Sequence, residues 1–122
     1  MSHIVHIKTE VRDFSAVGLA CNRMKIDAPV NGTFQLYNSE VTGCGIQLRE
    51  WNYPVVCLLR TGEIKFDNYE GRWGDPKRLD EFLQSYAVEK AKIEARKNGH
   101  SVAEKQLEDG SIKLTVSIGG VA

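Results

Sequence analysis

The chain has 122 residues, 42% of them hydrophobic, and its sixteen basic residues balance sixteen acidic ones. This length suits one globular domain with one core, and a net charge of zero gives no overall field that would attract nucleic acid or an anionic membrane. No apolar run is long enough for a transmembrane helix, and residues 1–13 carry His, Lys and Glu where a secretory signal needs an apolar core. We therefore expect a cytoplasmic protein.

The chain begins with a predicted strand and a predicted helix. Residues 2–11 alternate in polarity as a half-buried strand does, which puts His3 and His6 on opposite faces and makes their spacing poor for joint metal binding. Asp13 can cap the helix that follows. The apolar positions of this helix form one narrow stripe: Phe14, Val17, Cys21 and Met24.

Four strands and a loop are expected next. Residues 33–37 and 63–67 alternate between apolar and polar side chains, and residues 55–59 are an apolar run typical of a central strand covered on both faces. Glycines within residues 42–48 indicate a bulge, a tight bend or a close approach of the backbone. Residues 68–74 lack periodicity and predict an ordered surface loop.

A long helix is the clearest pattern in the chain. Asp75 suits the N-cap, Pro76 suits the first turn, and Gly99 suits a left-handed stop after the last turn. Apolar residues recur between these ends at three- and four-residue spacing: Leu79, Phe82, Leu83, Tyr86, Ala87 and Ile93. Lys90 falls near the centre of this stripe. We expect its methylenes to cover the core while its ammonium reaches water, with a buried, reactive amine as the alternative.

The chain ends in a predicted hairpin. Residues 102–107 and 112–118 flank Asp109 and Gly110, which favour a two-residue turn. This turn would place Lys105 opposite Leu114 on the apolar face, a position that a bulge or a sheet edge would have to accommodate.

Two helices among several short, hairpin-joined strands predict an α+β fold. We expect a mainly antiparallel sheet of six or seven strands with the two helices packed on one face. No linker or repeat divides the chain, so residues 1–122 are expected to form a single domain.

Three cysteines are spread along the chain: Cys21, Cys44 and Cys57. An odd number without C-x-x-C spacing argues against a disulfide framework and a zinc knuckle. Each cysteine sits where a small apolar residue is wanted, so we expect buried free thiols and neither metal nor cofactor. Convergence of the three thiols around a metal is the alternative.

The candidate binding site is the loop of residues 67–75. It combines Asp67, Tyr69, Arg72 and Trp73 with glycines that permit unusual backbone angles, and Arg and Trp are enriched at binding hot spots. In the structural alternative, Trp73 plugs the sheet edge and Arg72 pairs with a carboxylate at the helix entrance. No local motif joins a nucleophile, a base and an orienting group, so no catalytic residue is assigned.

Several stretches of the chain are distinctive in combination. They are residues 1–9 (MSHIVHIKT) with Arg12-Asp13, 66–69 (FDNY), 72–74 (RWG), the pair Tyr86-Ala87, 99–102 (GHSV) and 108–114 (EDGSIKL). Together they resemble a small conserved family of uncharacterised proteins, a domain of unknown function found in cyanobacteria, algal plastids and other bacteria including planctomycetes. The resemblance leaves residues 25–50 unmatched and supplies no catalytic residues. Because some members are encoded near AAA-type ATPases, it implies an accessory or adaptor role with such an ATPase as partner.

We therefore expect a noncatalytic protein-binding or adaptor module that binds another protein, or a second copy of itself, through a sheet edge and the aromatic loop. The alternative is a small-ligand-binding protein or a small enzyme with a pocket near the 67–75 loop. Nucleic acid ranks third because the net charge is zero, and no membrane partner is expected.

Overall fold

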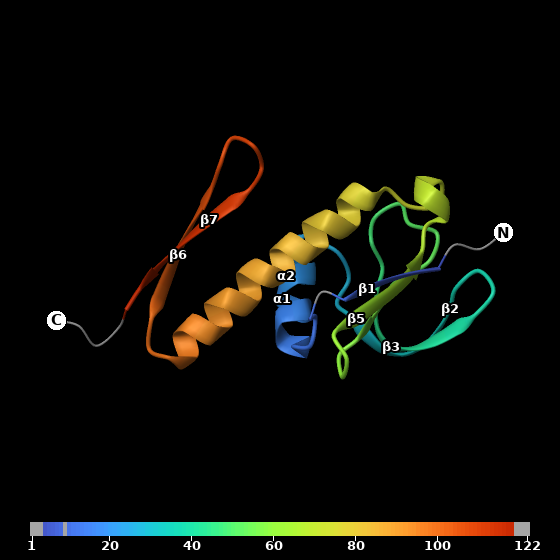
Figure 1. Cartoon of the computed structure of the whole chain (residues 1–122), viewed down its shortest axis with the longest axis horizontal. Coiled ribbons are helices and arrows are strands. Elements are labelled where there is room, and N and C mark those ends of the chain that lie inside the picture. Colours follow the sequence, from blue (N-terminus) through green and yellow to red (C-terminus); the bar gives the residue numbers. More distant parts are fainter. Residues whose placement is uncertain (1–3, 9, 119–122) are drawn as a thin grey trace. The chain divides into compact units, whose positions relative to one another are not determined.

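The computed structural model describes residues 4–8 and 10–118 and confirms an α+β fold (Figure 1). The elements are β1 (Ile4–Lys8), α1 (Phe14–Arg23), β2 (Val30–Gln35), β3 (Glu40–Ile46), β4 (Val55–Leu58), β5 (Glu63–Asp67), a short 3₁₀ turn (Tyr69–Gly71), α2 (Pro76–Lys97), β6 (Ser101–Gln106) and β7 (Ile112–Ser117). The chain divides into two compact units, whose boundary in sequence falls between Tyr86 and Ala87.

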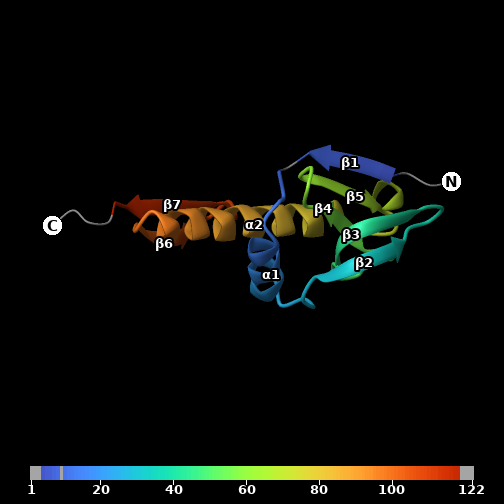
Figure 2. The same ribbon diagram turned by 90° about the horizontal axis from the view of Figure 1, so that it is seen from below.

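The first unit is built on a five-stranded antiparallel sheet with the strand order β1-β5-β4-β3-β2 (Figure 2). Strands β2 to β5 form a meander, and β1 pairs with β5 at the far edge. The prediction of one sheet is wrong, because β6 and β7 form a separate two-stranded sheet in the second unit. Strand β6 is separated from β5 by a 22-residue helix but from β7 by only a short loop. It therefore pairs with β7 and does not join the first sheet.

The main core of the first unit lies on one face of this sheet. Cys44, Cys57 and Ile64 are register neighbours on β3, β4 and β5, and all three are buried. Cys21 on α1 is buried as well, and it lies close enough to these strands that, in addition to burial, Cys44 raises the pKa of its thiol and Cys21 in turn raises the pKa of the Cys57 thiol. The expectation of buried free cysteines is confirmed.

A smaller apolar cluster lies on the opposite face of the sheet. Side chains alternate along a strand, so the side chain of Val56 lies on the face opposite to those of Val55 and Cys57. The members of the cluster are Leu36, Val41 and Val56, with Phe34, Tyr53 and Leu58 packed against them. The glycines of β3 serve this packing. A Cβ at Gly45 would lie 2.3 Å from the ring of Phe34, and one at Gly43 would lie 2.8 Å from the carbonyl oxygen of Cys57. The predicted close approach of the backbone is confirmed.

Helix α1 begins as predicted, with the amide of Ala16 donating to Oδ1 of Asp13 at 3.2 Å. Its buried face differs from the predicted stripe. The buried residues are Ala16, Val17, Ala20 and Cys21, whereas Phe14 is 45% exposed. Ala16 and Ala20 are thus part of the buried face, whereas Phe14, the first residue of the helix, lies toward solvent.

Both ends of α2 follow the prediction. The amide of Lys77 donates to Oδ1 of Asp75 at 3.0 Å, which satisfies one of the free donors of the first turn. At the other end Gly99 has a φ of +75°, and the amide of His100 donates to the carbonyl of Ala95 at 2.9 Å, as in a Schellman motif.

The predicted two-residue turn of the terminal hairpin is wrong. The amide of Leu107 donates to the carbonyl of Ser111 at 2.8 Å, so the loop holds three residues, Glu108 to Gly110. Only Gly110 takes a positive φ, since the carboxylate of Asp109 instead accepts hydrogen bonds from the amide and hydroxyl of Ser111. One extra residue shifts the register, and Lys105 lies opposite Lys113 instead of Leu114.

Two expectations at the start of the chain cannot be followed in full. His3 and the side chain of His6 lie outside the described residues, as do parts of the predicted strand at residues 2, 3 and 9.

Candidate functional site

The loop of residues 67–75 is held in one conformation by its own hydrogen bonds. Asp67 is fully buried, and its Oδ1 accepts from the amide of Tyr69 at 3.2 Å. Nδ2 of Asn68 donates to the carbonyl of Gly74 at 3.2 Å, and the amide of Trp73 donates to the carbonyl of Asn68 at 2.9 Å. These bonds close the loop on itself.

Three consecutive residues at the tip of this loop have left-handed backbone angles. The φ values are 47° for Tyr69, 54° for Glu70 and 98° for Gly71. Glycine adopts these backbone angles freely, but for Tyr and Glu they cost about 1–2 kcal/mol per residue. Such strain persists only where the surrounding structure imposes it, and it concentrates at functional sites.

Trp51 anchors the loop to the core. It is buried, its ring meets Phe66 edge-on at 5.6 Å, and its Nε1 donates to the carbonyl of Asp75 at 3.1 Å. The backbone of Gly74 lies against the indole so closely that a Cβ there would come within 2.3 Å of the ring. Trp51 was not predicted as part of the site, because the polar residues around it show neither strand nor helix periodicity.

Four aromatic rings and a guanidinium gather beside this anchor, in a group that we call the aromatic patch: Tyr37, Tyr53, Tyr69, Arg72 and Trp73. The Trp73 ring lies 4.7 Å from the Tyr69 ring, 5.1 Å from the Tyr37 ring and 5.6 Å from the Tyr53 ring, between centroids. The guanidinium carbon of Arg72 lies 5.2 Å from the centroid of Tyr69, within the range of a cation–π contact.

The patch is assembled from three segments of the first unit. Tyr37 lies in the connection between β2 and β3, Tyr53 lies between β3 and β4, and the other members belong to the loop. Tyr37 is 46% exposed and Arg72 is exposed, whereas the other three rings are half-buried. Tyr53 also packs on the apolar cluster of Leu36, Val41 and Val56, which supports the patch from below.

The predicted site residues thus fall into two groups. Tyr69, Arg72 and Trp73 come together on the surface of the patch, whereas buried Asp67 serves the loop from within. Tyr37 and Tyr53 were missed because each lies in a separate connection, and only the folded meander brings them to Trp73.

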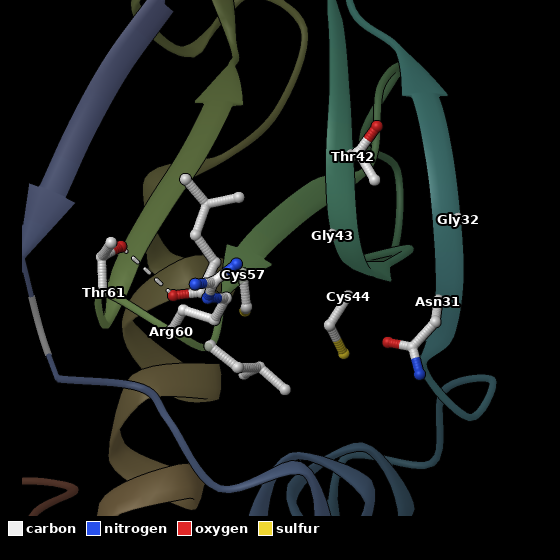
Figure 3. Close-up of a pocket in the computed structure, with 10 residues that line it drawn as sticks. Asn31, Gly32, Thr42, Gly43, Cys44, Cys57, Arg60 and Thr61 are labelled. Atoms are coloured by element: carbon white, nitrogen blue, oxygen red, sulfur yellow. Dashed lines mark hydrogen bonds between the residues drawn. The ribbon is translucent and has the colours of Figure 1, made fainter.

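A cavity of about 750 Å³ lies elsewhere in the first unit, where β3 and β4 stop pairing (Figure 3). Its lining residues include Cys44 and Cys57 of the neighbouring strands, Asn31, Thr42 and Leu58, and Arg60 and Thr61 of the β4–β5 turn. Burial raises the pKa of the Cys44 thiol to about 11 and raises the pKa of Cys57 further, so both groups are neutral at physiological pH. No residue of the 67–75 loop lines this cavity.

The other expectations about chemistry can be stated briefly. Among the residues that the structure describes, no three His, Cys, Asp or Glu side chains come together in a way that could hold a metal ion. Nζ of Lys90 lies 2.7 Å from Oε1 of Glu94, and both side chains are substantially exposed, which agrees with an ammonium that reaches water. Neither helix of the described chain has the length and apolar character to cross a membrane.

Comparison of the chain with protein-family models, with curated proteins and with solved structures finds no match. The assignment of a function therefore depends on the geometry of the patch and the cavity.

Proposed function

We propose that this protein is a noncatalytic protein-binding module whose contact surface is the aromatic patch. The observation that supports this proposal is the grouping of Trp73 with three tyrosines and Arg72 on a surface built from three segments. Trp, Tyr and Arg carry a disproportionate share of the binding energy at protein interfaces. Trp and Tyr add a large flat contact area at a low cost in conformational entropy, and Arg adds a planar cation with several hydrogen-bond donors.

The patch is also preorganised. Hydrogen bonds close the 67–75 loop, Trp51 fixes its end, and the left-handed angles of Tyr69 and Glu70 hold the tip in a conformation that a free loop would rarely visit. Little further ordering is needed when a partner binds, so more of the contact energy appears as affinity.

The chemistry of the patch suggests the kind of partner. Exposed Tyr37 offers an apolar ring with a polar tip, and exposed Arg72 offers a cation over the ring of Tyr69. A partner surface with an apolar anchor next to a carboxylate would complement both. The resemblance described above makes an AAA-type ATPase the first partner to test, and a cytoplasmic location stays a prediction.

Two predictions about the fold also stay predictions. They are the packing of both helices on one face of the five-stranded sheet and the folding of residues 1–122 as a single domain.

Affinity capture from cells of the native host tests the proposal. Tyr37→Ala and Arg72→Ala should each lower the recovery of a specific partner by about tenfold, since truncating a hot-spot residue costs more than 1–2 kcal/mol. Phe14→Ala is the matched control for Tyr37, because Phe14 is an aromatic residue of α1 that is 45% exposed, against 46% for Tyr37. Arg96→Ala is the control for Arg72.

The captured proteins should be quantified by mass spectrometry against the unaltered chain. The proposal fails if the patch variants and the control variants recover the same proteins in the same amounts.

Binding of a small ligand in the 750 Å³ cavity is the second candidate function, and the lining of the cavity favours it. Arg60 is the sole charged residue among the lining residues, and the thiols beneath are neutral. Two leucines and two cysteines are the apolar residues of the lining, and Asn31 and two threonines are its hydrogen-bonding residues. This combination suits a small anion with an apolar body.

The fluorescent anion 1-anilinonaphthalene-8-sulfonate can serve as the probe. Saturable binding to the folded protein that Arg60→Gln weakens and Arg96→Gln leaves unchanged would support a ligand site. Equal binding by both variants would count against it.

A further inference from the structure

Within the described residues, β7 of the hairpin in the second unit has an edge that no other strand pairs with, and its side chains complement those of β7 in a second copy of the chain. Strands β6 and β7 form a sheet of only two strands among the described residues, and no residue from Ser101 to Ile118 is buried. Val116 is 48% exposed and Ile118 is 65% exposed. A two-stranded sheet is marginally stable, and three or more strands with an apolar face are far more favourable.

The register separates the two faces of this hairpin. Val102 lies opposite Val116, and Glu104 lies opposite Leu114. Because side chains alternate along a strand, one face carries the apolar residues of β7, and the other face carries Lys105 opposite Lys113, with Thr115 next to them. The apolar set on the first face is Val102, Ile112, Leu114, Val116 and, beyond the end of β7, Ile118.

The backbone pattern shows which amides point to the free edge of β7. Leu107 and Ser111 form the hydrogen-bonded pair next to the loop. In an antiparallel pair, hydrogen-bonded and non-hydrogen-bonded positions alternate. The N–H and C=O groups of Lys113 and Thr115 therefore point toward β6, and those of Leu114 and Val116 point outward to the edge.

We propose that β7 pairs with β7 of a second copy of this chain, antiparallel, about a two-fold axis at Thr115. In this register the outward groups of Leu114 face those of Val116 in the second copy, and Ile112 faces Ile118. Lys113 faces Ser117, so no lysine faces a lysine across the new interface. The result is a four-stranded sheet with an isologous contact, in which the two central strands carry a continuous set of apolar side chains on one face.

The edge of β6 does not offer the same match. Its outward groups belong to Val102, Glu104 and Gln106, by the same alternation. A two-fold pairing centred on Glu104 puts this carboxylate opposite itself, and like charges directly opposite are unfavourable. A two-fold pairing centred on Ala103 puts Glu104 opposite Val102, so neither arrangement gives the row of apolar pairs that β7 offers. Glu104 is also engaged by Lys92, with Nζ 3.2 Å from Oε2.

Sedimentation analysis of the full chain over a concentration series provides the first test. We expect a reversible dimer. Val116→Pro removes one outward amide of β7 while sparing the bonds to β6, so it should shift the equilibrium to monomer by tenfold or more. Gln106→Pro makes the same change at the outer edge of β6 and should leave the dimer intact.

Cross-linking tests the register itself. Residues on the two-fold axis form a non-hydrogen-bonded pair with a Cα separation of about 4.5 Å, which suits a disulfide. With diamide as the oxidant, Thr115→Cys should give a covalent dimer, whereas Lys113→Cys, whose neighbour is Ser117 of the second copy, should not. The three native cysteines are buried and should remain reduced.

Two outcomes would overturn the proposal. One is a chain that stays monomeric at all concentrations, whether or not the edge of β7 binds a different protein. The other is a dimer that survives Val116→Pro or that cross-links equally well through position 113 and position 115.

Discussion

Gly74 shows how one absent side chain positions the candidate site. Its backbone lies against the buried ring of Trp51, and a Cβ there would come within 2.3 Å of Cδ2 of the indole. We predict that Gly74→Ala lowers the free energy of unfolding by about 1–3 kcal/mol, because either the ring or the loop must move. Urea denaturation followed by tryptophan fluorescence measures this loss.

Gly18 is the matched control for this substitution. It lies within α1, and a Cβ built on it would meet no other atom within 4 Å. Gly18→Ala should therefore raise stability by about 0.5–1 kcal/mol through helix propensity. A Gly74→Ala protein as stable as the unaltered chain would show that Trp51 is not the fixed anchor described above.

The buried cysteines predict a dependence of stability on alkaline pH. Burial raises the pKa of Cys21 and of Cys44 from an ordinary 9.0 to about 11. Between pH 9 and pH 11 these thiols are therefore largely deprotonated in the unfolded chain but still protonated in the folded chain. The free energy of unfolding should thus be independent of these groups below pH 9 and should fall as pH rises from 9 to 11.

Urea denaturation at a series of pH values, with Cys21→Ala/Cys44→Ala as the comparison, isolates this effect from other groups that titrate in the same range. The slope should be shallower in the double variant. Parallel curves for the two proteins would contradict the prediction.

At the scale of elements, Tyr86 joins α2 to the start of α1 within the first unit. Its hydroxyl accepts hydrogen bonds from the amides of Arg12 and Asp13, both at 3.1 Å. We predict that Tyr86→Phe costs about 1–3 kcal/mol of stability, since it keeps the ring but leaves two backbone donors without this acceptor. Tyr37→Phe should be nearly neutral, because Tyr37 is 46% exposed and its hydroxyl can bond to water.

Chemical denaturation of the two variants gives the comparison directly. Equal stability of Tyr86→Phe and Tyr37→Phe would mean that water replaces the tyrosine hydroxyl at no cost.

At the scale of the whole molecule, the two units differ in how much of their secondary structure is buried. Strand β4 is paired on both sides and three of its four residues are buried, whereas the hairpin of β6 and β7 contains no buried residue among those described. We predict that in dilute solution the amides of the hairpin exchange with deuterium much faster than those of β4.

Hydrogen exchange resolved by NMR measures this difference for each residue. Raising the protein concentration should protect the amides of Leu114 and Val116, which point to the free edge of β7, more than those of β4. Slow exchange of the hairpin in dilute protein, equal to that of β4, would show that the second unit is stable by itself.

Much of the fold was determined by local sequence. Asp13 and Asp75 cap helices through the amides of their own first turns, and Gly99 ends α2 because only a residue tolerant of positive φ fits there. Such features depend on a few neighbouring residues, so the pattern alone predicts them. The hairpin loop shows the limit of this reasoning. The carboxylate of Asp109 accepts a hydrogen bond from the amide of Ser111, the loop holds three residues instead of two, and the pairing partner of Lys105 changes from Leu114 to Lys113.

The candidate site was predictable only in part for the same physical reason. Tyr69, Arg72 and Trp73 are adjacent in sequence and could be recognised as a group. Tyr37, Tyr53 and Trp51 reach them only through the pairing of β2 to β5, and long-range pairing leaves no local periodicity to read. Sequence by itself thus determined the elements and the loop, whereas the tertiary structure decided which aromatic rings meet, because ring contacts depend on strand order and register.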